Sequence, residues 1–169
     1  MKNTAIVTGA SSGIGREISR VLVEMGYEVY GFGREFPEEE VYFHPIVCDL
    51  LNTPELERQI KEIRRRNDVS LLVNNAGVGY YGLHEELNVQ KIQKLVRTNL
   101  EVPMVLTNLL LRDLKKYSGT VINISSVTAQ LSNPHGCAYG ATKAGLSSFS
   151  RSLFDEVRKY GVRVVTVSY

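Results

Sequence analysis

Tyr139 and Lys143 stand four residues apart in the stretch YGATK. Residues at this spacing share one face of a helix, so the ammonium of Lys143 can lie beside the phenol of Tyr139. A phenol has a reference pKa near ~10, and its pKa must fall to roughly 7 for proton exchange at neutral pH, a change worth about 4 kcal/mol. A unit charge about 4 Å away supplies roughly that energy at an effective dielectric of about 20. The pair therefore fits a general acid/base, with an ordinary surface pair as the alternative.

A glycine-rich turn, TGASSGIG, occupies residues 8–15 between a short apolar run and a helical pattern. Gly9, Gly13 and Gly15 remove side chains where the backbone turns and where a pyrophosphate would approach the N–H groups of a helix start. Their spacing differs from the standard G-x-G-x-x-G fingerprint, and a tight turn with close helix–strand packing is the alternative. The position at the first strand–helix junction favours nucleotide binding.

The elements that must position these residues alternate along the chain. The predicted strands span residues 4–8, 27–32, 41–48, 69–74, 119–125 and 162–168. The predicted helices are the run from Ile14 to Met25 and residues 53–66, 88–117 and 138–160. The apolar face of the first helix is predicted at Ile14, Ile18, Val21, Leu22 and Met25. Pro45 weakens the start of the third strand, and Pro103 is expected to kink or divide the long helix.

Nearly all-apolar strands that alternate with helices predict a parallel sheet covered on both faces. Right-handed crossovers then give a three-layer, doubly wound α/β fold of the Rossmann type with about six strands. No linker or change of composition divides residues 1–169, so one domain is expected.

Composition argues against several other classes. The net charge is +2, from 20 basic and 18 acidic residues, which points to no nucleic-acid or membrane partner, and the basic run at residues 64–66 fits a solvated helix end. Two cysteines, Cys48 and Cys137, are too few for a disulfide framework or a zinc site. The most apolar stretch, residues 102–111, is too short to cross a membrane. A cytoplasmic protein is expected.

Four motifs together resemble the classical short-chain dehydrogenase/reductase family: TGASSGIG, NNAG at residues 74–77, Ser126 and YGATK. The resemblance runs from the first strand to the last residue. It implies that Tyr139 and Lys143 are catalytic, that Ser126, thirteen residues before the tyrosine, completes the site, and that Asn99 is a fourth member. Lys143 is also implied to contact the nicotinamide ribose, and Asn99 to hold a water in a proton relay.

Alternatives remain for two of these residues. Ser126 follows a predicted strand, where its hydroxyl could hold a substrate oxygen as charge develops, but it could also be a turn residue. Asn99 could cap or kink the helix near Pro103.

The end of the second strand bears on the choice of cofactor. NAD-binding members of the family carry an acid where this chain has Gly33, followed by Arg34. An arginine suits a 2′-phosphate, so NADP(H) is favoured over NAD(H), although Glu35 keeps NAD(H) open. Asp49, with a turn role as its alternative, resembles the aspartate that touches the adenine ring. The predicted cofactor-binding residues are Gly9, Ser11, Ser12, Gly13, Ile14, Gly15, Arg34, Asp49, Asn75, Ala76, Gly77, Tyr139 and Lys143.

Other side chains near these motifs receive weaker assignments. The three histidines, His44, His84 and His135, show no ligand spacing, so no metal site is expected. Cys137 is interpreted as a packing residue. Tyr80, Tyr81 and Leu83 follow NNAG and either line a pocket or form an exposed loop.

The resulting hypothesis is an oxidoreductase that moves a hydride between NADP(H) and a small-molecule secondary alcohol or carbonyl compound. A nucleotide-binding remnant or interaction protein without turnover is the alternative, and an extended-family sugar epimerase fits the turn and NNAG less well. The family usually continues beyond VVTVSY with a substrate-covering segment and a further strand, which the chain is expected to lack. Three explanations stay open: the chain is a fragment, its gene is truncated, or another subunit fills the gap. An exposed edge is then expected at Val162, Val164, Val165 and Val167.

A homodimer or homotetramer is expected through residues 88–117 and 138–160, the segments that the resemblance implies for the interface. The leucines of the first segment indicate more apolar surface than one core-facing stripe requires. These are Leu106, Leu109, Leu110 and Leu111.

Overall fold

The computed structural model describes residues 3–37, 41–126, 132 and 134–168. It contains one parallel sheet of six strands in the order β3-β2-β1-β4-β5-β6. The strands are β1 (Thr4–Thr8), β2 (Glu28–Gly33), β3 (His44–Val47), β4 (Val69–Asn74), β5 (Thr120–Ser125) and β6 (Arg163–Ser168). The order reverses between β1 and β4, which is the place where sheets of this kind bind ligands beyond their carboxyl ends. The predicted Rossmann-type α/β fold is confirmed.

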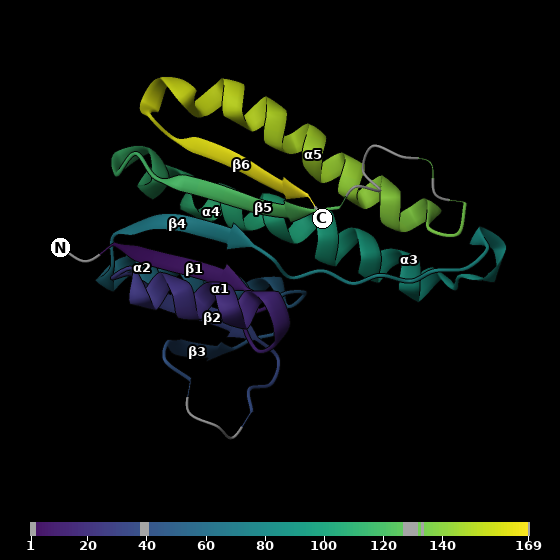
Figure 1. Ribbon diagram of the computed structural model, residues 1–169, viewed down its shortest axis with the longest axis horizontal. Helices are drawn as coiled ribbons and strands as arrows, with labels where there is room; N and C mark the ends of the chain where they lie inside the picture. The colour runs from purple at the N-terminus through teal and green to yellow at the C-terminus, as the bar shows by residue number, and fades with distance from the viewer. Residues whose placement is uncertain (1–2, 38–40, 127–131, 133, 169) are drawn as a thin grey trace.

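Helices cover both faces of the sheet (Figure 1). They are α1 (Gly13–Glu24), α2 (Thr53–Arg66), α3 (Val89–Val96), α4 (Val102–Lys116) and α5 (Cys137–Val157), with short helical turns η1 (His84–Glu86), η2 (Arg97–Glu101) and η4 (Arg158–Tyr160). A core cluster on one face joins α1 to the sheet, and a larger one on the other face joins α2, α4 and α5 to it. None of the described helices is long and apolar enough to cross a membrane.

The predicted long helix at residues 88–117 is divided by a π-helical turn. α3 leads into η2, and α4 follows with Pro103 as its second residue. Proline has no N–H and is tolerated in a first helical turn, so a helix can restart here without losing a bond. The wider π turn holds Asn99, which is buried at 1% exposure. The expected division at Pro103 is therefore present, and it presents Asn99 to the interior.

Two predicted details are wrong. The third strand is shorter than residues 41–48, and Pro45 lies inside β3, where it is tolerated because β3 is an edge strand. Of the predicted apolar face of α1, Leu22 is buried and Ile18 packs against the core, but Ile14, Val21 and Met25 are exposed. Gly15 and Ser19 complete the buried face. Small residues on the inner face let α1 lie close to the glycine-rich turn.

The predicted surplus of apolar surface on α4 is partly used by packing within the monomer. Leu106 and Leu110 are fully buried, and Leu109 and Leu111 pack against the same core cluster. Neighbouring helices α2 and α5 and the sheet cover α4 on several sides, so a broad apolar face is needed for the monomer alone. A homodimer or homotetramer stays a prediction.

The sheet edge at β6 is partly as expected. Val165 and Val167 are 42% and 43% exposed, but Val162 is buried at 2% and Val164 packs against the core. Alternate residues of a strand point to opposite faces, so only one face of β6 shows its valines.

Candidate active site

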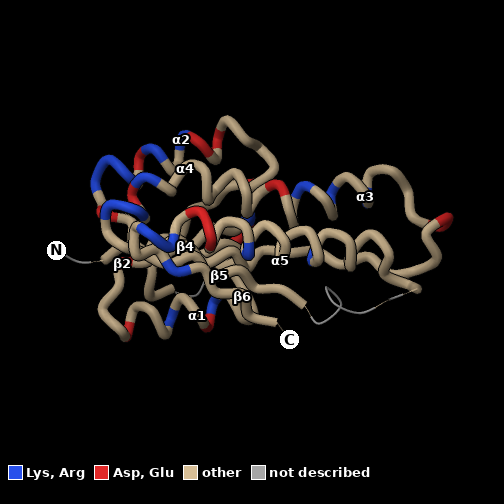
Figure 2. Tube along the Cα trace, turned by 90° about the horizontal axis from the view of Figure 1, so that it is seen from above, with Lys and Arg blue, Asp and Glu red and all other residues tan. Residues whose placement is uncertain are grey.

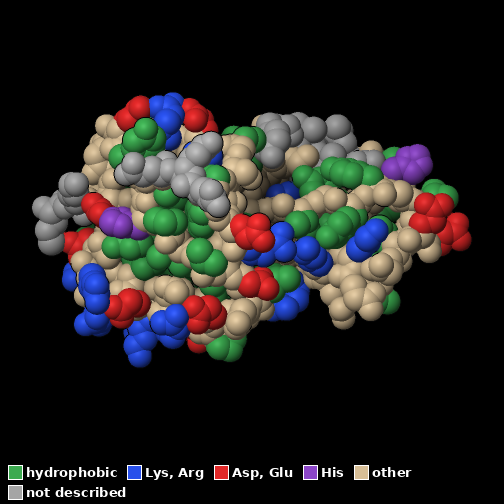
Figure 3. Space-filling model, turned by 90° about the horizontal axis from the view of Figure 1, so that it is seen from below, with side chains coloured by type: hydrophobic (Ala, Val, Ile, Leu, Met, Phe, Trp, Pro, Cys, Tyr) green, Lys and Arg blue, Asp and Glu red, His purple; other side chains and the backbone are tan. Residues whose placement is uncertain are grey.

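A cavity of about 520 Å³ opens at the carboxyl ends of β1, β2 and β4. This volume lies within the range of roughly 300–1,000 Å³ that is common for cofactor sites. Its lining residues are Gly9, Ser11, Ser12, Ile14, Phe32, Gly33, Arg34, Cys48, Asp49, Leu50, Leu51, Asn75, Ala76, Gly77, Val78, Lys94 and Thr98. Seen from below, the surface is notched between the body of the molecule and the α3 end, and Lys and Arg side chains gather beside the notch (Figure 3). Most of the predicted cofactor-binding residues therefore meet at one cavity.

The glycines of the first turn have separate structural roles. Gly9 has φ +64°, and a Cβ there would lie 3.0 Å from the Cα of Ala76. A Cβ on Gly15 would lie only 2.0 Å from the carbonyl oxygen of Gly9, so this position requires glycine for packing. Gly13 and Gly15 do not line the cavity, in contrast to Gly9. The tight-turn interpretation thus holds for Gly15, whereas Gly9 lies where the nucleotide-binding interpretation predicts it.

The N-terminus of α1 is open toward the cavity. Ser12 is the N-cap residue in extended conformation, and its side chain makes no capping hydrogen bond to the helix. The first turn of α1 contains no acidic residue. Its N–H groups are therefore available to donate hydrogen bonds to an anion, which is the arrangement expected for a pyrophosphate site.

Thr8 fixes the NNAG segment against the first turn. Its Oγ1 accepts hydrogen bonds from the backbone N–H groups of Asn75 and Ala76, both at 3.0 Å. The side chain of Asn75 donates to the carbonyl oxygen of Gly9 at 3.3 Å. The two predicted cofactor-binding segments are consequently held as one wall of the cavity.

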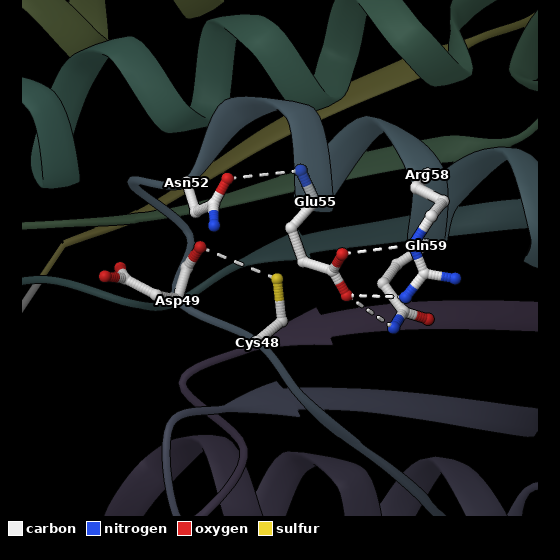
Figure 4. A network of polar contacts seen from close by, with 6 residues as sticks. All are labelled: Cys48, Asp49, Asn52, Glu55, Arg58 and Gln59. Atoms are coloured by element: carbon white, nitrogen blue, oxygen red, sulfur yellow. Dashed lines mark hydrogen bonds and ion pairs between the residues drawn. The ribbon is translucent and has the colours of Figure 1, made fainter.

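Asp49 lies at the opposite wall, in the turn between β3 and α2. One carboxylate oxygen accepts a hydrogen bond from the N–H of Leu51 at 3.0 Å, which fits the turn interpretation. The carboxylate points away from the network of Glu55 and Arg58 (Figure 4). Beside it, Cys48 is buried, and burial, followed by the Glu55 and Asp49 carboxylates, raises the pKa of its thiol. Cys48 is thus an unreactive wall residue, whereas Asp49 keeps an oxygen for a ligand.

Two further polar residues line the cavity that sequence reasoning missed. Lys94 on α3 and Thr98 on η2 are both half-buried there. They lie four residues apart, as neighbours on one helix face do, and Thr98 immediately precedes Asn99. That spacing was a usable signal.

Lys143 lies in the interior beside Tyr139. Its side chain is 6% exposed, and Nζ donates a hydrogen bond to the carbonyl oxygen of Ile124 at 3.3 Å. Nζ is 5.8 Å from the centroid of the Tyr139 ring. Burial lowers the pKa of Lys143 below its ordinary value, and no ion pair to it occurs among the described residues. An ammonium in this position gains from any nearby negative charge, including a phenolate.

Asn99 binds the loop that follows NNAG. Its Oδ1 accepts from the N–H of Val78 at 2.8 Å, and its Nδ2 donates to the carbonyl oxygen of Val78 at 2.8 Å and to Thr142 Oγ1 at 3.2 Å. A Cβ on Gly77 would lie 3.4 Å from both Asn99 Oδ1 and Lys143 Nζ. Asn99 and Lys143 therefore both lie beside Gly77, at the end of NNAG. The side-chain amide of Asn99 fixes the backbone of Val78 in the loop that follows.

Ser126 directly follows β5 and is half-buried. Its position is two residues beyond Ile124, the carbonyl of which binds Lys143. Residues 127–131 and 133, between Ser126 and α5, lie outside the described residues. The structure thus places Ser126, Tyr139 and Lys143 around the same carboxyl edge of the sheet, with Tyr139 half-buried.

Within the described residues, no group of three or more His, Cys, Asp or Glu side chains could hold a metal ion. His44 stacks on Tyr30 and contacts Glu28, His84 begins the short helix η1, and the carbonyl of His135 accepts a hydrogen bond from Gly82. Cys137 is exposed and begins α5 rather than packing inside, so its predicted packing role is wrong.

Comparison with known proteins agrees with this architecture. A family described as short chain dehydrogenase matches residues 3–168. The serine 3-dehydrogenase of Agrobacterium fabrum is 33% identical to this chain, over 99% of this chain and 71% of the relative. The NADPH-dependent 3-dehydrocapnine reductase of Ornithobacterium rhinotracheale is 32% identical, over 96% of this chain and 63% of the relative. The structure of a metagenomic short-chain oxidoreductase in complex with NADP has a TM-score of 0.88 at 30% identity, over 98% of this chain and 81% of that one. The chain belongs to the short-chain dehydrogenase family.

Proposed function

We propose that this protein is an NADP(H)-dependent oxidoreductase that interconverts a secondary alcohol and a carbonyl compound, with Tyr139 as the general acid/base. The observation that carries the proposal is the buried ammonium of Lys143 beside the Tyr139 ring, without a carboxylate partner among the described residues. A buried, unpaired cation is costly, so its presence at this position calls for a function.

The residues around the cavity suit a nicotinamide dinucleotide. The open N-terminus of α1 with Ser12 would hold the pyrophosphate, Asp49 the adenine side, and Lys143 the nicotinamide ribose. Arg34 is exposed at the cavity and would bind the 2′-phosphate of NADP(H). Two similar proteins support this choice, since one is named as NADPH-dependent and the other was crystallised with NADP. When bound, the nicotinamide supplies or removes the hydride.

The chain's own side chains would handle the proton and the developing charge. In reduction, the Tyr139 hydroxyl gives its proton to the carbonyl oxygen, and the Lys143 ammonium stabilises the phenolate that remains. The hydroxyl of Ser126 donates a hydrogen bond to the same oxygen as negative charge develops on it. In oxidation the proton returns from the alcohol to Tyr139. Asn99, by holding Val78, keeps the loop beside Tyr139 in place.

A titration of the purified chain with NADPH and, separately, NADH tests the cofactor half of the proposal. Reduced-nicotinamide fluorescence is followed, and tighter binding of NADPH is expected. Turnover is then measured on a panel of ketones and aldehydes. Absence of binding to both nucleotides would overturn the proposal, and NADPH binding without turnover of any carbonyl compound would favour a nucleotide-binding protein that lacks catalysis.

A further inference from the structure

We propose that Tyr81 is the substrate-facing wall of this site and selects carbonyl compounds with a flat aromatic group bonded to the carbonyl carbon. The inference rests on the proposed function, because it uses Tyr139 as the point where the carbonyl oxygen must lie. It concerns a residue of the loop between NNAG and η1, at residues 78–83, which lies outside the cofactor cavity except for Val78.

The ring of Tyr81 contacts the ring of Tyr139. Their centroids are 5.5 Å apart and the ring planes are inclined at 47°. This separation is typical of favourable aromatic pairs, which prefer tilted or offset arrangements. Tyr81 is nevertheless 62% exposed, so most of its ring is available to a ligand beside Tyr139.

The loop that carries Tyr81 is fastened on both sides of it. Three residues before, Val78 is bound through both its N–H and its carbonyl by the side chain of Asn99. One residue after, the N–H of Gly82 donates to the carbonyl of His135 at 2.8 Å, which joins the loop to the segment before α5. Tyr81 is therefore a preorganised ring, and binding against it requires little further ordering.

Geometry then limits what lies against this ring. A general acid must be within about 2.6–3.2 Å of the atom that it protonates, so the carbonyl oxygen lies at the Tyr139 hydroxyl. The substituents of the carbonyl carbon are one bond farther, within reach of a ring that touches Tyr139. Leu83, 45% exposed, adds an apolar side chain in the same loop, and hydrophobic side chains gather on the α3 end of the lower face (Figure 3). An aryl group at this position can form an offset or tilted aromatic pair with the exposed Tyr81 ring, whereas a saturated group gains only the burial of apolar area.

The test compares two methyl ketones that differ only in the group on the carbonyl carbon, acetophenone and cyclohexyl methyl ketone. The ratio of kcat/KM for the aryl ketone to that for the cyclohexyl ketone is measured in the wild type, Tyr81→Phe and Tyr81→Ala. Tyr81→Ala is expected to lower this ratio roughly 2- to 10-fold, the size of an aromatic contact, and Tyr81→Phe to retain it. Tyr160→Ala, at a ring 44% exposed beside Lys115, is the matched control and is expected to leave the ratio unchanged.

An unchanged ratio in Tyr81→Ala would overturn the inference. An equal loss for both ketones would also overturn it, because Tyr81 would then only position Tyr139. The dissociation constant of NADPH is also measured for every variant. If this constant is unchanged, the change in the kcat/KM ratio cannot come from weaker cofactor binding. If the wild type reduces neither ketone, the proposed function fails for this class, and binding of the same ketones in the presence of NADP⁺ is followed by saturation-transfer NMR. A preference for acetophenone that disappears in Tyr81→Ala upholds the inference even then, and no such preference overturns it.

Discussion

Two tyrosine–lysine pairs lie at opposite edges of the sheet. At the carboxyl edge, Lys143 Nζ is 5.8 Å from the Tyr139 ring centroid, and at the amino edge Lys116 Nζ is 5.3 Å from that of Tyr117. The hydroxyl of Tyr117 donates a hydrogen bond to Asp68, and this bond above all raises the pKa of Tyr117. Tyr117 therefore keeps its proton more firmly than an ordinary tyrosine, although the ammonium of Lys116 lies near its ring. A neighbouring ammonium is therefore not enough to prepare a phenol for proton transfer, because a carboxylate that accepts a hydrogen bond from the phenol stabilises its protonated form.

Cations that are already paired also distinguish one cavity of the molecule from another. One of about 380 Å³ at the amino edge is lined by Arg64, Arg65 and Arg66 together with Thr4, Glu28, Asn67 and Asp68. Each of these arginines forms an ion pair, with Asp113 or with Glu62. Basic residues gather where α2 and α4 end, as suits helix C-termini (Figure 2). At the carboxyl-edge cavity, Arg34 and Lys94 have no ion pair among the described residues. Paired cations support the fold, and unpaired cations beside a cavity are available to a ligand.

Replacing the two tyrosines tests the comparison most severely. Tyr139→Phe removes the general acid and is expected to lower kcat at least ~100-fold, because such groups contribute roughly 10²–10⁴. Tyr117→Phe removes a chemically identical hydroxyl beside a lysine and is expected to leave kcat unchanged. Steady-state reduction of a ketone by NADPH measures both. Equal activities of Tyr139→Phe and the wild type would contradict the assignment of the acid, and NADPH binding by both variants shows that they are folded.

The arginines provide a second matched pair. Arg34→Ala is expected to weaken NADPH binding roughly 10- to 100-fold, the loss of charge-assisted hydrogen bonds to a phosphate, and to leave NADH binding nearly unchanged. Arg66→Ala removes an arginine that is already paired with Glu62 at 3.0 Å and is expected to affect neither nucleotide. Fluorescence titrations of the four combinations provide the measurement. If Arg34→Ala weakened NADH as much as NADPH, Arg34 would not be reading the 2′-phosphate.

Lys143 allows a test of stability without substrate. Its pKa is lowered in the folded protein because burial disfavours the charge, so the unfolded chain binds its proton more tightly. The resulting destabilisation is complete below the lowered pKa, diminishes as pH rises through it, and vanishes above the ordinary lysine value near 10.5. Lys143→Met is therefore expected to unfold at a higher temperature than the wild type at neutral pH, by roughly 2–4 °C for each kcal/mol relieved.

The pH dependence of the difference in unfolding temperature between Lys143→Met and the wild type tests this explanation more directly than the difference itself. Thermal unfolding of both proteins at several pH values from 7 upward should show the gap closing as pH increases. Lys115→Met, which replaces a lysine near the exposed Tyr160 ring, is the control and should show no such gap. A Lys143→Met protein less stable than the wild type at pH 7 would mean that the hydrogen bond to Ile124 outweighs the cost of burying the charge.

The sequence predicted the fold and the segments that meet at the carboxyl edge because strand–helix alternation and motif position are local signals. It failed where the outcome depends on neighbours. The predicted apolar face of α1 is right at Ile18 and Leu22 but wrong at its other three residues, Ile14, Val21 and Met25. Gly15 packs inward against Gly9 instead. The four-residue spacing of Lys94 and Thr98 was a signal that sequence reasoning did not use. Nothing in the sequence shows that the hydroxyl of Tyr117 donates a hydrogen bond to Asp68. The catalytic and binding roles of the predicted site residues stay predictions until they are measured.

The smallest expected effect concerns the stability of the amino-edge pair. Because the pKa of Tyr117 is raised in the folded protein, its hydrogen bond to Asp68 stabilises the fold fully below the ordinary phenol pKa near 10 and is lost as pH rises through the raised value. Tyr117→Phe should thus lower the unfolding temperature slightly at pH 7, with the difference shrinking above pH ~10. Tyr160→Phe is the control. A pH-independent difference would mean that packing of the hydroxyl, and not its proton, stabilises this edge, and the contrast between the two tyrosines would then rest on Lys143 alone.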